Sequence, residues 1–165
     1  VTTIYFVPSM FSAFLHWLPE GRVYKTLARV ICGGEALSVA HKELWYKKMP
    51  GNVELHNSYG PTEASIGVTY YQVSKGDVFI PIGRAVANTQ LYILGQDGQI
   101  VPLGVFGELC IAGVQLARGY LNRNELTAEK FVQHPFEPGD RMYRTGDLAR
   151  WWPDGNMEFL GRLEW

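Results

Sequence analysis

Strand-like and helix-like segments alternate over residues 1–57, and this alternation restricts the fold more than any other feature. The strand-like runs are TTIYFV (2–7), LARVI (27–31) and VELHN (53–57). Between them, Pro8 and Ser9 open a segment with a near-helical apolar period, and Ser38 can cap a second helix that ends near Met49. Strands separated by helices at this spacing predict a βαβ-type layer with a parallel sheet.

Two short segments rich in glycine and polar residues follow the second and third of these strands. They are GGE (33–35) and NSYGPTEAS (57–65), which has poor helix and strand propensity and is therefore expected to be a loop. In parallel sheets, ligands gather where strands end at their carboxyl edge. The sequence therefore predicts two loops that face one crevice.

From about Ser65 onward the sequence consists mainly of short β-rich runs separated by turns. The runs are SIGVTYYQV, TQLYIL, GELCIAG and the residues around MYRTG, with turn signals at GQDGQ and PDGN. One helical patch, LTAEKFV (126–132), follows a candidate cap at Asn124. The fold class is therefore expected to be α/β plus β, a layered βαβ sheet (1–80) followed by a distorted β-barrel or meander (81–165).

Composition and charge narrow the classes of function. Apolar residues make up 47% of the chain and charged residues 19%, as in globular proteins. A formal charge of -1 provides no field for nucleic acid or an anionic membrane, and no apolar run approaches the ~20 residues that span a bilayer. Cys32 and Cys110 lie in apolar runs without metal-binding spacing, which indicates buried thiols in a reducing cytoplasm.

Three small clusters carry groups suited to a nucleotide. Thr62 and Glu63 offer a hydroxyl and a carboxylate for phosphate and Mg²⁺, and Tyr59 can stack on a base, although Thr62 could instead be a helix cap. Asp147 can accept hydrogen bonds from two ribose hydroxyls, although Gly-Asp is also a common turn. Arg162 suits phosphate or sugar oxygens, although it could be a solvated surface residue. Neither GxxxxGKS/T nor GxGxxG is present, so a different nucleotide fold is required.

Several longer motifs occur in a characteristic order. They are NSYGPTE, GELCIAGVQLARGYL (107–121), YRTGDLARW (143–151) and PDGNMEFLGR (153–162). Together they resemble the adenylation domain of nonribosomal peptide synthetases, in the adenylate-forming (ANL) superfamily. The resemblance implies activation of an amino acid by MgATP as an aminoacyl adenylate. It also implies transfer of the acyl group to phosphopantetheine on a peptidyl carrier domain, beside condensation domains of the same synthetase.

Two alternatives to an amino-acid-activating domain remain open. One is an acyl-CoA or aryl-acid ligase of the same superfamily, and the other is a non-catalytic scaffold domain. The joint presence of Thr62, Glu63, Asp147 and Arg162 argues against a decayed site.

The resemblance also implies roles for individual residues of the nucleotide site. Gly34 and Glu35 are expected against the adenine, Asn57 at its exocyclic amine, and Tyr59 stacked on it opposite Phe159. Ser58 and Gly60 complete the nucleotide contacts. Asp147 is expected at the ribose, and the proposed catalytic set is Thr62 at phosphate, Glu63 at the metal and Arg162 at the ribose-phosphate region.

The family's amino-acid pocket maps onto part of this chain, at Tyr5, Ile31, Gly33, Ser58, Ile66 and Gly67. The glycines leave room, and Tyr5 and Ser58 can form hydrogen bonds, although Tyr5 and Ile31 could simply be core residues. The aspartate that usually holds the substrate's amino group is not in this chain, so an amino acid and a hydroxy acid both remain possible.

The chain is expected to be a fragment of a longer protein. The family's Ser/Thr/Gly-rich phosphate loop is expected upstream, and its small C-terminal subdomain with a catalytic lysine downstream. The chain is expected to end at the family's hinge, where Glu164 stands in place of the usual Asp. The isolated fragment is therefore expected to be inactive.

Overall fold

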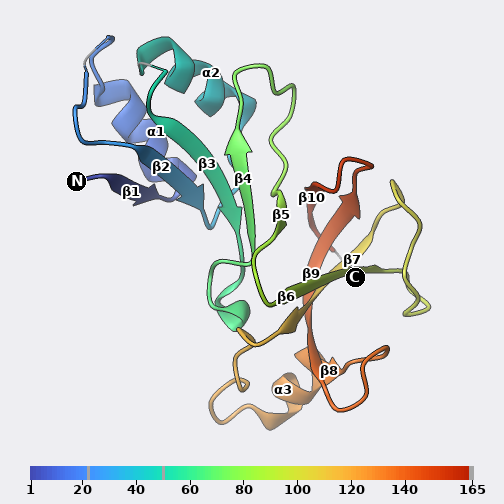
Figure 1. Ribbon diagram of the computed structural model, residues 1–165. Helices are drawn as coiled ribbons and strands as arrows, with labels where there is room; N and C mark the ends of the chain where they lie inside the picture. Colours follow the sequence, from blue (N-terminus) through green and yellow to red (C-terminus); the bar gives the residue numbers. More distant parts are fainter. Residues whose placement is uncertain (22, 50, 164–165) are drawn as a thin grey trace.

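The computed structural model describes residues 1–21, 23–49 and 51–163, so the expectation for Glu164 lies outside the described residues. These residues form two five-stranded sheets (Figure 1). The first sheet has the order β1 (Thr3–Phe6), β2 (Arg29–Gly33), β3 (Glu54–Tyr59), β4 (Thr69–Val73) and β5 (Arg84–Ala85). The second has the order β10 (Met157–Arg162), β9 (Arg141–Trp151), β7 (Gly107–Gly113) and β6 (Thr89–Leu94), with β8 (Phe131–Gln133) paired to β9. The helices are α1 (Pro8–Trp17), α2 (Val39–Lys48) and α3 (Asn124–Lys130), and η1 (Thr62–Ala64) is a 3₁₀ turn.

The first sheet confirms the predicted βαβ layer. Strands β1, β2 and β3 are parallel, and α1 and α2 pack on one face of the sheet (Figure 1). The Phe11 and Trp45 rings, with centroids 5.7 Å apart, bring the two helices together over Val30 and Leu55, which are fully buried. The Ser38 cap is also confirmed, since its Oγ accepts a hydrogen bond from the His41 backbone N–H at 3.3 Å.

The expectation that residues 57–65 form a loop is wrong for two segments of this run. Strand β3 continues through Tyr59, and η1 begins at Thr62. Ladder pairing on both sides of β3 overrides the weak strand propensity of this run, because Ser58 lies opposite Gly33 and Tyr59 lies opposite Thr69. A helix cap at Thr62 is also wrong, since Pro61 occupies the cap position and no side chain caps the turn.

The predicted helix at 126–132 is shifted toward the N-terminus. Helix α3 includes Asn124 and ends at Lys130, so Arg123 rather than Asn124 is the cap residue. Phe131 and Val132 begin strand β8 instead. Phe131 lies opposite Tyr143 with ring centroids 5.0 Å apart, and burial of this aromatic pair favours the strand over another turn of helix.

The second sheet is antiparallel and open, so the distorted meander is confirmed, and the described strands do not close into a barrel. The two sheets meet where the Ile82 N–H donates to the Met157 carbonyl at 2.8 Å and the Met157 N–H donates to the Gly83 carbonyl at 2.9 Å. The first sheet extends through Ala85, and the division at residue 80 stays a prediction.

The two cysteines are buried as predicted. Both are free thiols with no exposed surface, and burial raises the pKa of each to about 12. No helix within the described ranges combines the length and apolar character needed to cross a lipid bilayer.

Candidate active site

A cavity of about 280 Å³ lies where the two sheets meet, and both sheets contribute to its wall. Eight of its lining residues were predicted from the sequence: Gly34, Glu35, Ser58, Tyr59, Gly60, Asp147, Phe159 and Arg162. Ala36, Pro61 and Ile82 complete the wall. The predicted crevice is therefore present, and it combines residues from far apart in the sequence.

The GGE segment is held against the start of helix α1. Val7, the residue at the N-cap position of α1, makes no side-chain cap. The Glu35 carboxylate instead accepts hydrogen bonds from the Ser9 backbone N–H at 2.9 Å and from the Ser9 hydroxyl at 3.1 Å. Glu35 thereby satisfies a free N–H of the first helical turn and fixes one rim of the cavity.

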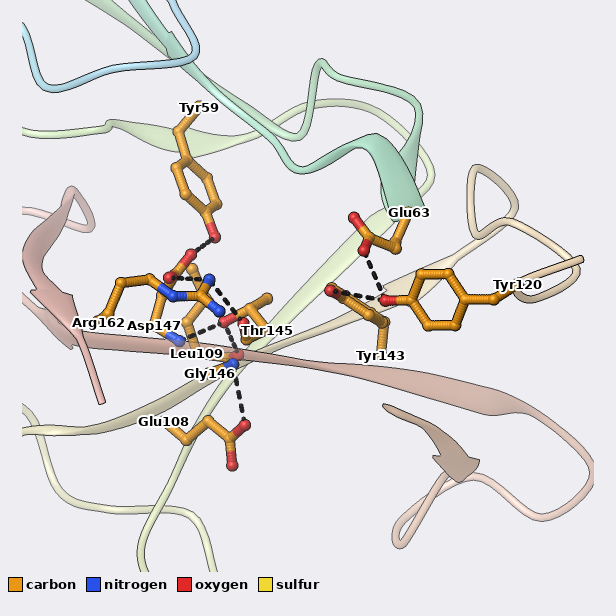
Figure 2. A network of polar contacts seen from close by, with 10 residues as sticks. All are labelled: Tyr59, Glu63, Glu108, Leu109, Tyr120, Tyr143, Thr145, Gly146, Asp147 and Arg162. Carbon is orange, nitrogen blue, oxygen red and sulfur yellow. Dashed lines mark hydrogen bonds and ion pairs between the residues drawn. The ribbon is translucent and has the colours of Figure 1, made fainter. Parts of the chain in front are cut away.

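Asp147 lies at the centre of a polar network that links the two sheets (Figure 2). The Tyr59 hydroxyl donates to Asp147 Oδ2 at 2.5 Å, and Arg162 Nη1 lies 2.7 Å from Asp147 Oδ1. Burial and the negative charge of Asp147 raise the pKa of Tyr59, so its hydroxyl stays protonated and donates. The negative charge of Asp147 raises the pKa of Arg162 as well.

Two aromatic rings form an apolar wall beside this network. The Tyr59 and Phe159 rings have centroids 6.0 Å apart and are tilted by 32° to each other. Both line the cavity, together with the apolar side chain of Ile82. The cavity therefore has the mixed character of a small-molecule site, with apolar walls and a few convergent polar groups.

Glu63 does not line the cavity but belongs to a second polar group near it (Figure 2). Its Oε1 accepts a hydrogen bond from the Tyr120 hydroxyl at 2.5 Å, and the Tyr143 hydroxyl lies 3.5 Å from that of Tyr120. Burial acts to raise the pKa of the Glu63 carboxyl, but the hydrogen bonds it accepts, first that from Tyr120, outweigh burial and lower its pKa. Glu63 is therefore an ionised carboxylate at neutral pH, and its oxygens are suited to bind a cation. Thr62 is exposed beside it and lies outside the cavity lining.

Asn57 also lies outside the cavity lining. It is buried, and its Nδ2 donates to the Pro81 carbonyl at 2.9 Å. This contact holds the segment that leads to Ile82, so in the structure Asn57 supports the cavity wall from behind.

The residues predicted for the amino-acid pocket fall into two groups. Tyr5, Ile31, Gly33 and Ser58 share the face of the first sheet that α1 and α2 do not cover, because Val30, Cys32 and Leu55 occupy the other face. Tyr5 is 49% exposed, so it is not a core residue. Ile66 and Gly67 are exposed in the turn after η1.

Gly33 is required by the packing of Tyr5 against it. A Cβ atom at Gly33 would lie 2.0 Å from the Tyr5 hydroxyl oxygen and 2.8 Å from the Ser58 carbonyl oxygen. The absent side chain therefore sets how closely the Tyr5 ring approaches the end of β2.

Several residues of the site were not identified from the sequence. Tyr120 and Tyr143 lie within the quoted motifs, but only the fold shows that they face Glu63. Ile82 lies in an apolar stretch with no local signal. Across the described ranges, no group of three or more His, Cys, Asp or Glu side chains is placed to hold a metal ion.

Comparison with known proteins identifies the family of the chain. A family model described as AMP-binding enzyme matches residues 1–121. The chain belongs to the AMP-binding enzyme family. It is 52% identical over 165 residues to phosphinothricin tripeptide synthetase PhsB of Streptomyces viridochromogenes, covering 98% of this chain and 14% of that protein. It is 47% identical over 161 residues to tyrocidine synthase 2 of Brevibacillus parabrevis, covering 98% of this chain and 4% of that protein. The chain thus spans only a small part of these curated relatives.

Solved structures of this family share the fold. Holo-PA1221, an NRPS protein containing adenylation and PCP domains bound to a vinylsulfonamide inhibitor, superposes with a TM-score of 0.88 at 32% identity. The match covers 98% of this chain and 28% of that structure. The α/β architecture with two sheets is therefore that of part of an AMP-binding adenylation domain.

Proposed function

We propose that this chain forms the nucleotide-binding core of an ATP-dependent, AMP-forming amino-acid ligase, an adenylation domain of nonribosomal peptide synthesis. The observation that carries the proposal is the contact of Tyr59 and Arg162 with Asp147 across one cavity. The names of the relatives, a tripeptide synthetase and a tyrocidine synthase, support it.

The cavity suits the nucleoside part of ATP. Adenine can stack on the aromatic wall formed by Tyr59 and Phe159, with Gly34, Glu35, Ser58 and Gly60 lining the same cavity. Each Asp147 carboxylate oxygen retains a further lone pair, so ribose hydroxyls can donate to it beside Tyr59 and Arg162. Arg162 supplies the positive charge that phosphate oxygens require.

The donor set near η1 suits Mg²⁺. Glu63 is ionised, and its Oε1 accepts a hydrogen bond from Tyr120. Mg²⁺ is commonly held by one or two carboxylates together with substrate phosphates, so a single carboxylate is sufficient here. Thr62 is exposed beside Glu63, and its hydroxyl can donate a hydrogen bond to a phosphate oxygen. Bound Mg²⁺ would neutralise charge on the phosphates, and Tyr120 orients the Glu63 carboxylate toward it.

The reaction that follows has two steps. The carboxylate of the acid attacks the α-phosphorus of ATP, pyrophosphate leaves, and an acyl adenylate forms. A phosphopantetheine thiol on a carrier domain then attacks the acyl carbon, giving a thioester and AMP. Arg162 lowers the charge repulsion in the first step, and the two sheets hold the reactants in alignment.

The partners follow from this chemistry. We infer an amino acid or related acid as substrate, with peptidyl carrier and condensation domains as neighbours in a cytoplasmic synthetase. The near-neutral charge favours neither a nucleic acid nor a membrane partner.

Pyrophosphate exchange tests the proposed function. The full-length protein that carries this chain should exchange labelled pyrophosphate into ATP with one or a few members of a panel of amino acids. Exchange only with aryl or fatty acids would favour the related acid ligases. Exchange with no acid in the panel would favour a scaffold.

Replacing Glu63 with glutamine should raise the Mg²⁺ concentration that gives half-maximal exchange by roughly tenfold, because a neutral amide is a much weaker ligand for a hard cation. The measurement is a Mg²⁺ titration at saturating ATP and acid. Glu129→Gln is the matched control, since Glu129 is an exposed carboxylate on α3 paired with Lys130. An unchanged Mg²⁺ titration in Glu63→Gln would remove the metal role.

Replacing Gly33 with alanine should raise KM for the acid by roughly tenfold while KM for ATP changes little. The added methyl group would collide with the Tyr5 hydroxyl and displace that ring in the proposed acid pocket. The double variant Gly33→Ala with Tyr5→Phe removes the nearest colliding atom and should recover part of the loss. A rise in KM for ATP instead would place Tyr5 and Gly33 outside the acid pocket.

A further inference from the structure

Strand β9 carries a bulge immediately before Asp147. Leu109 of β7 lies opposite Asp147, but the next residue, Cys110, lies opposite Arg144. Thr145 and Gly146 are therefore extra residues on β9. Gly146 has φ of +70°, a left-handed conformation that strains any residue with a side chain. Bulges of this kind turn a neighbouring side chain toward a new direction, and here that side chain is Asp147.

The polar groups of the bulge are held by partners on β7. The Thr145 hydroxyl donates to the Leu109 carbonyl at 2.6 Å and accepts from the Asp147 N–H at 2.9 Å. The Gly146 N–H has no ladder partner and donates instead to Oε1 of Glu108 at 3.1 Å. Without Glu108, this N–H would lose its acceptor.

Glu108 is a carboxylate held in place by charge as well as by this hydrogen bond. Its side chain is only 9% exposed, and its Oε2 accepts from Arg144 Nε at 3.0 Å and Nη2 at 2.5 Å. Arg144 is 48% exposed, so it neutralises the carboxylate from the solvent side. Figure 2 shows Glu108 on the opposite side of β9 from Tyr59, and it does not line the cavity.

We propose that Glu108 is a positioning residue for nucleotide binding. By accepting the Gly146 N–H it holds the bulge in its left-handed form and so aims Asp147 at Tyr59 and Arg162 across the cavity. Glu108 acts through the backbone and touches no ligand. The inference rests on the proposed function, because the role of Asp147 is ATP binding.

The test, made in the full-length protein, separates the role of Glu108 as hydrogen-bond acceptor for Gly146 from its ion pair with Arg144. Glu108→Met keeps roughly the length of the side chain but replaces the carboxylate with a thioether, which is only a weak acceptor, and it should raise KM for ATP about tenfold, the loss of roughly one hydrogen bond to a charged group. Glu108→Gln and Arg144→Gln both lose the ion pair but keep an acceptor for Gly146. Both should change KM for ATP less than about threefold, and KM for the acid should be unchanged in all three.

Glu158→Met is the matched control, because Glu158 forms an ion pair of the same kind with Arg150 of β9, at 2.7 Å, without touching the bulge. Its KM for ATP should be that of the unaltered protein. Thermal melting of each variant separates loss of stability from loss of positioning. If Glu108→Met does not fold, Glu108→Asp replaces it, since its carboxylate is one methylene too short to reach Gly146 and Arg144 together.

Three results would overturn the inference. The first is an unchanged KM for ATP in Glu108→Met. The second is a rise in KM for ATP in Arg144→Gln equal to that in Glu108→Met. The third is a rise in KM for ATP that the Glu158→Met control shares. An Asp147→Ala reference separates this inference from the proposed function. If Asp147→Ala leaves KM for ATP unchanged, the proposed function fails, whereas a rise there with none in Glu108→Met defeats the inference alone.

Discussion

Replacing Asp147 with alanine should raise KM for ATP by roughly 10- to 100-fold while changing KM for the acid less than about threefold. Asp147 is buried at the cavity and bonded to Tyr59 and Arg162, so its loss removes the proposed ribose acceptor and frees both partners. A hydrogen bond to a charged group contributes about 1.5 to 3 kcal/mol, and each 1.4 kcal/mol is about tenfold in affinity. Steady-state pyrophosphate exchange with either substrate varied measures both constants.

The control for this prediction is Asp140→Ala, which removes an exposed carboxylate immediately before β9, the strand that carries Asp147. Its kinetic constants should match those of the unaltered protein. Equal effects of Asp147→Ala on both KM values would contradict ribose binding and indicate a general disturbance of the site. A melting curve for each variant checks that the fold is retained.

Replacing Trp45 with alanine should destabilise the protein by about 3 to 5 kcal/mol, the usual cost of removing a large aromatic side chain from a core. Trp45 has no exposed surface and packs against Phe11, so it holds α1 and α2 together over the first sheet. The midpoint of urea denaturation, followed by circular dichroism, measures the loss.

Trp17→Ala is the matched control, because Trp17 is 70% exposed at the end of α1. A surface substitution of this kind changes stability by about 0.5 kcal/mol or less. Comparable destabilisation by the two variants would mean that the helix-covered face is not the core of this layer.

Local patterns predicted most of the regular structure. The alternation of strand-like and helix-like runs predicted the parallel strands and the two helices that cover them, and Ser38 predicted the start of α2. The prediction was wrong where long-range pairing opposed local propensity. Ser58 and Tyr59 extend β3 beyond the predicted strand because neighbouring strands pair with them, and Phe131 leaves the predicted helix because it pairs with Tyr143.

The site shows the same limit. The resemblance carried by the motifs implied nucleotide-binding roles for eight residues that line the cavity. The motifs did not predict Tyr120 as the partner of Glu63 or Glu108 as the partner of Gly146. The members of these pairs are separated by 57 and 38 residues in the chain.

The sequence by itself determined the family, the order of the elements and the chemical groups available for a nucleotide, because periodicity, capping and motif spacing are local properties. The tertiary structure alone decided which of these groups meet. Tyr59 and Asp147 are 88 residues apart, and their contact depends on how the two sheets join at Ile82 and Met157. That join is set by backbone pairing and packing between distant segments, which no local pattern encodes.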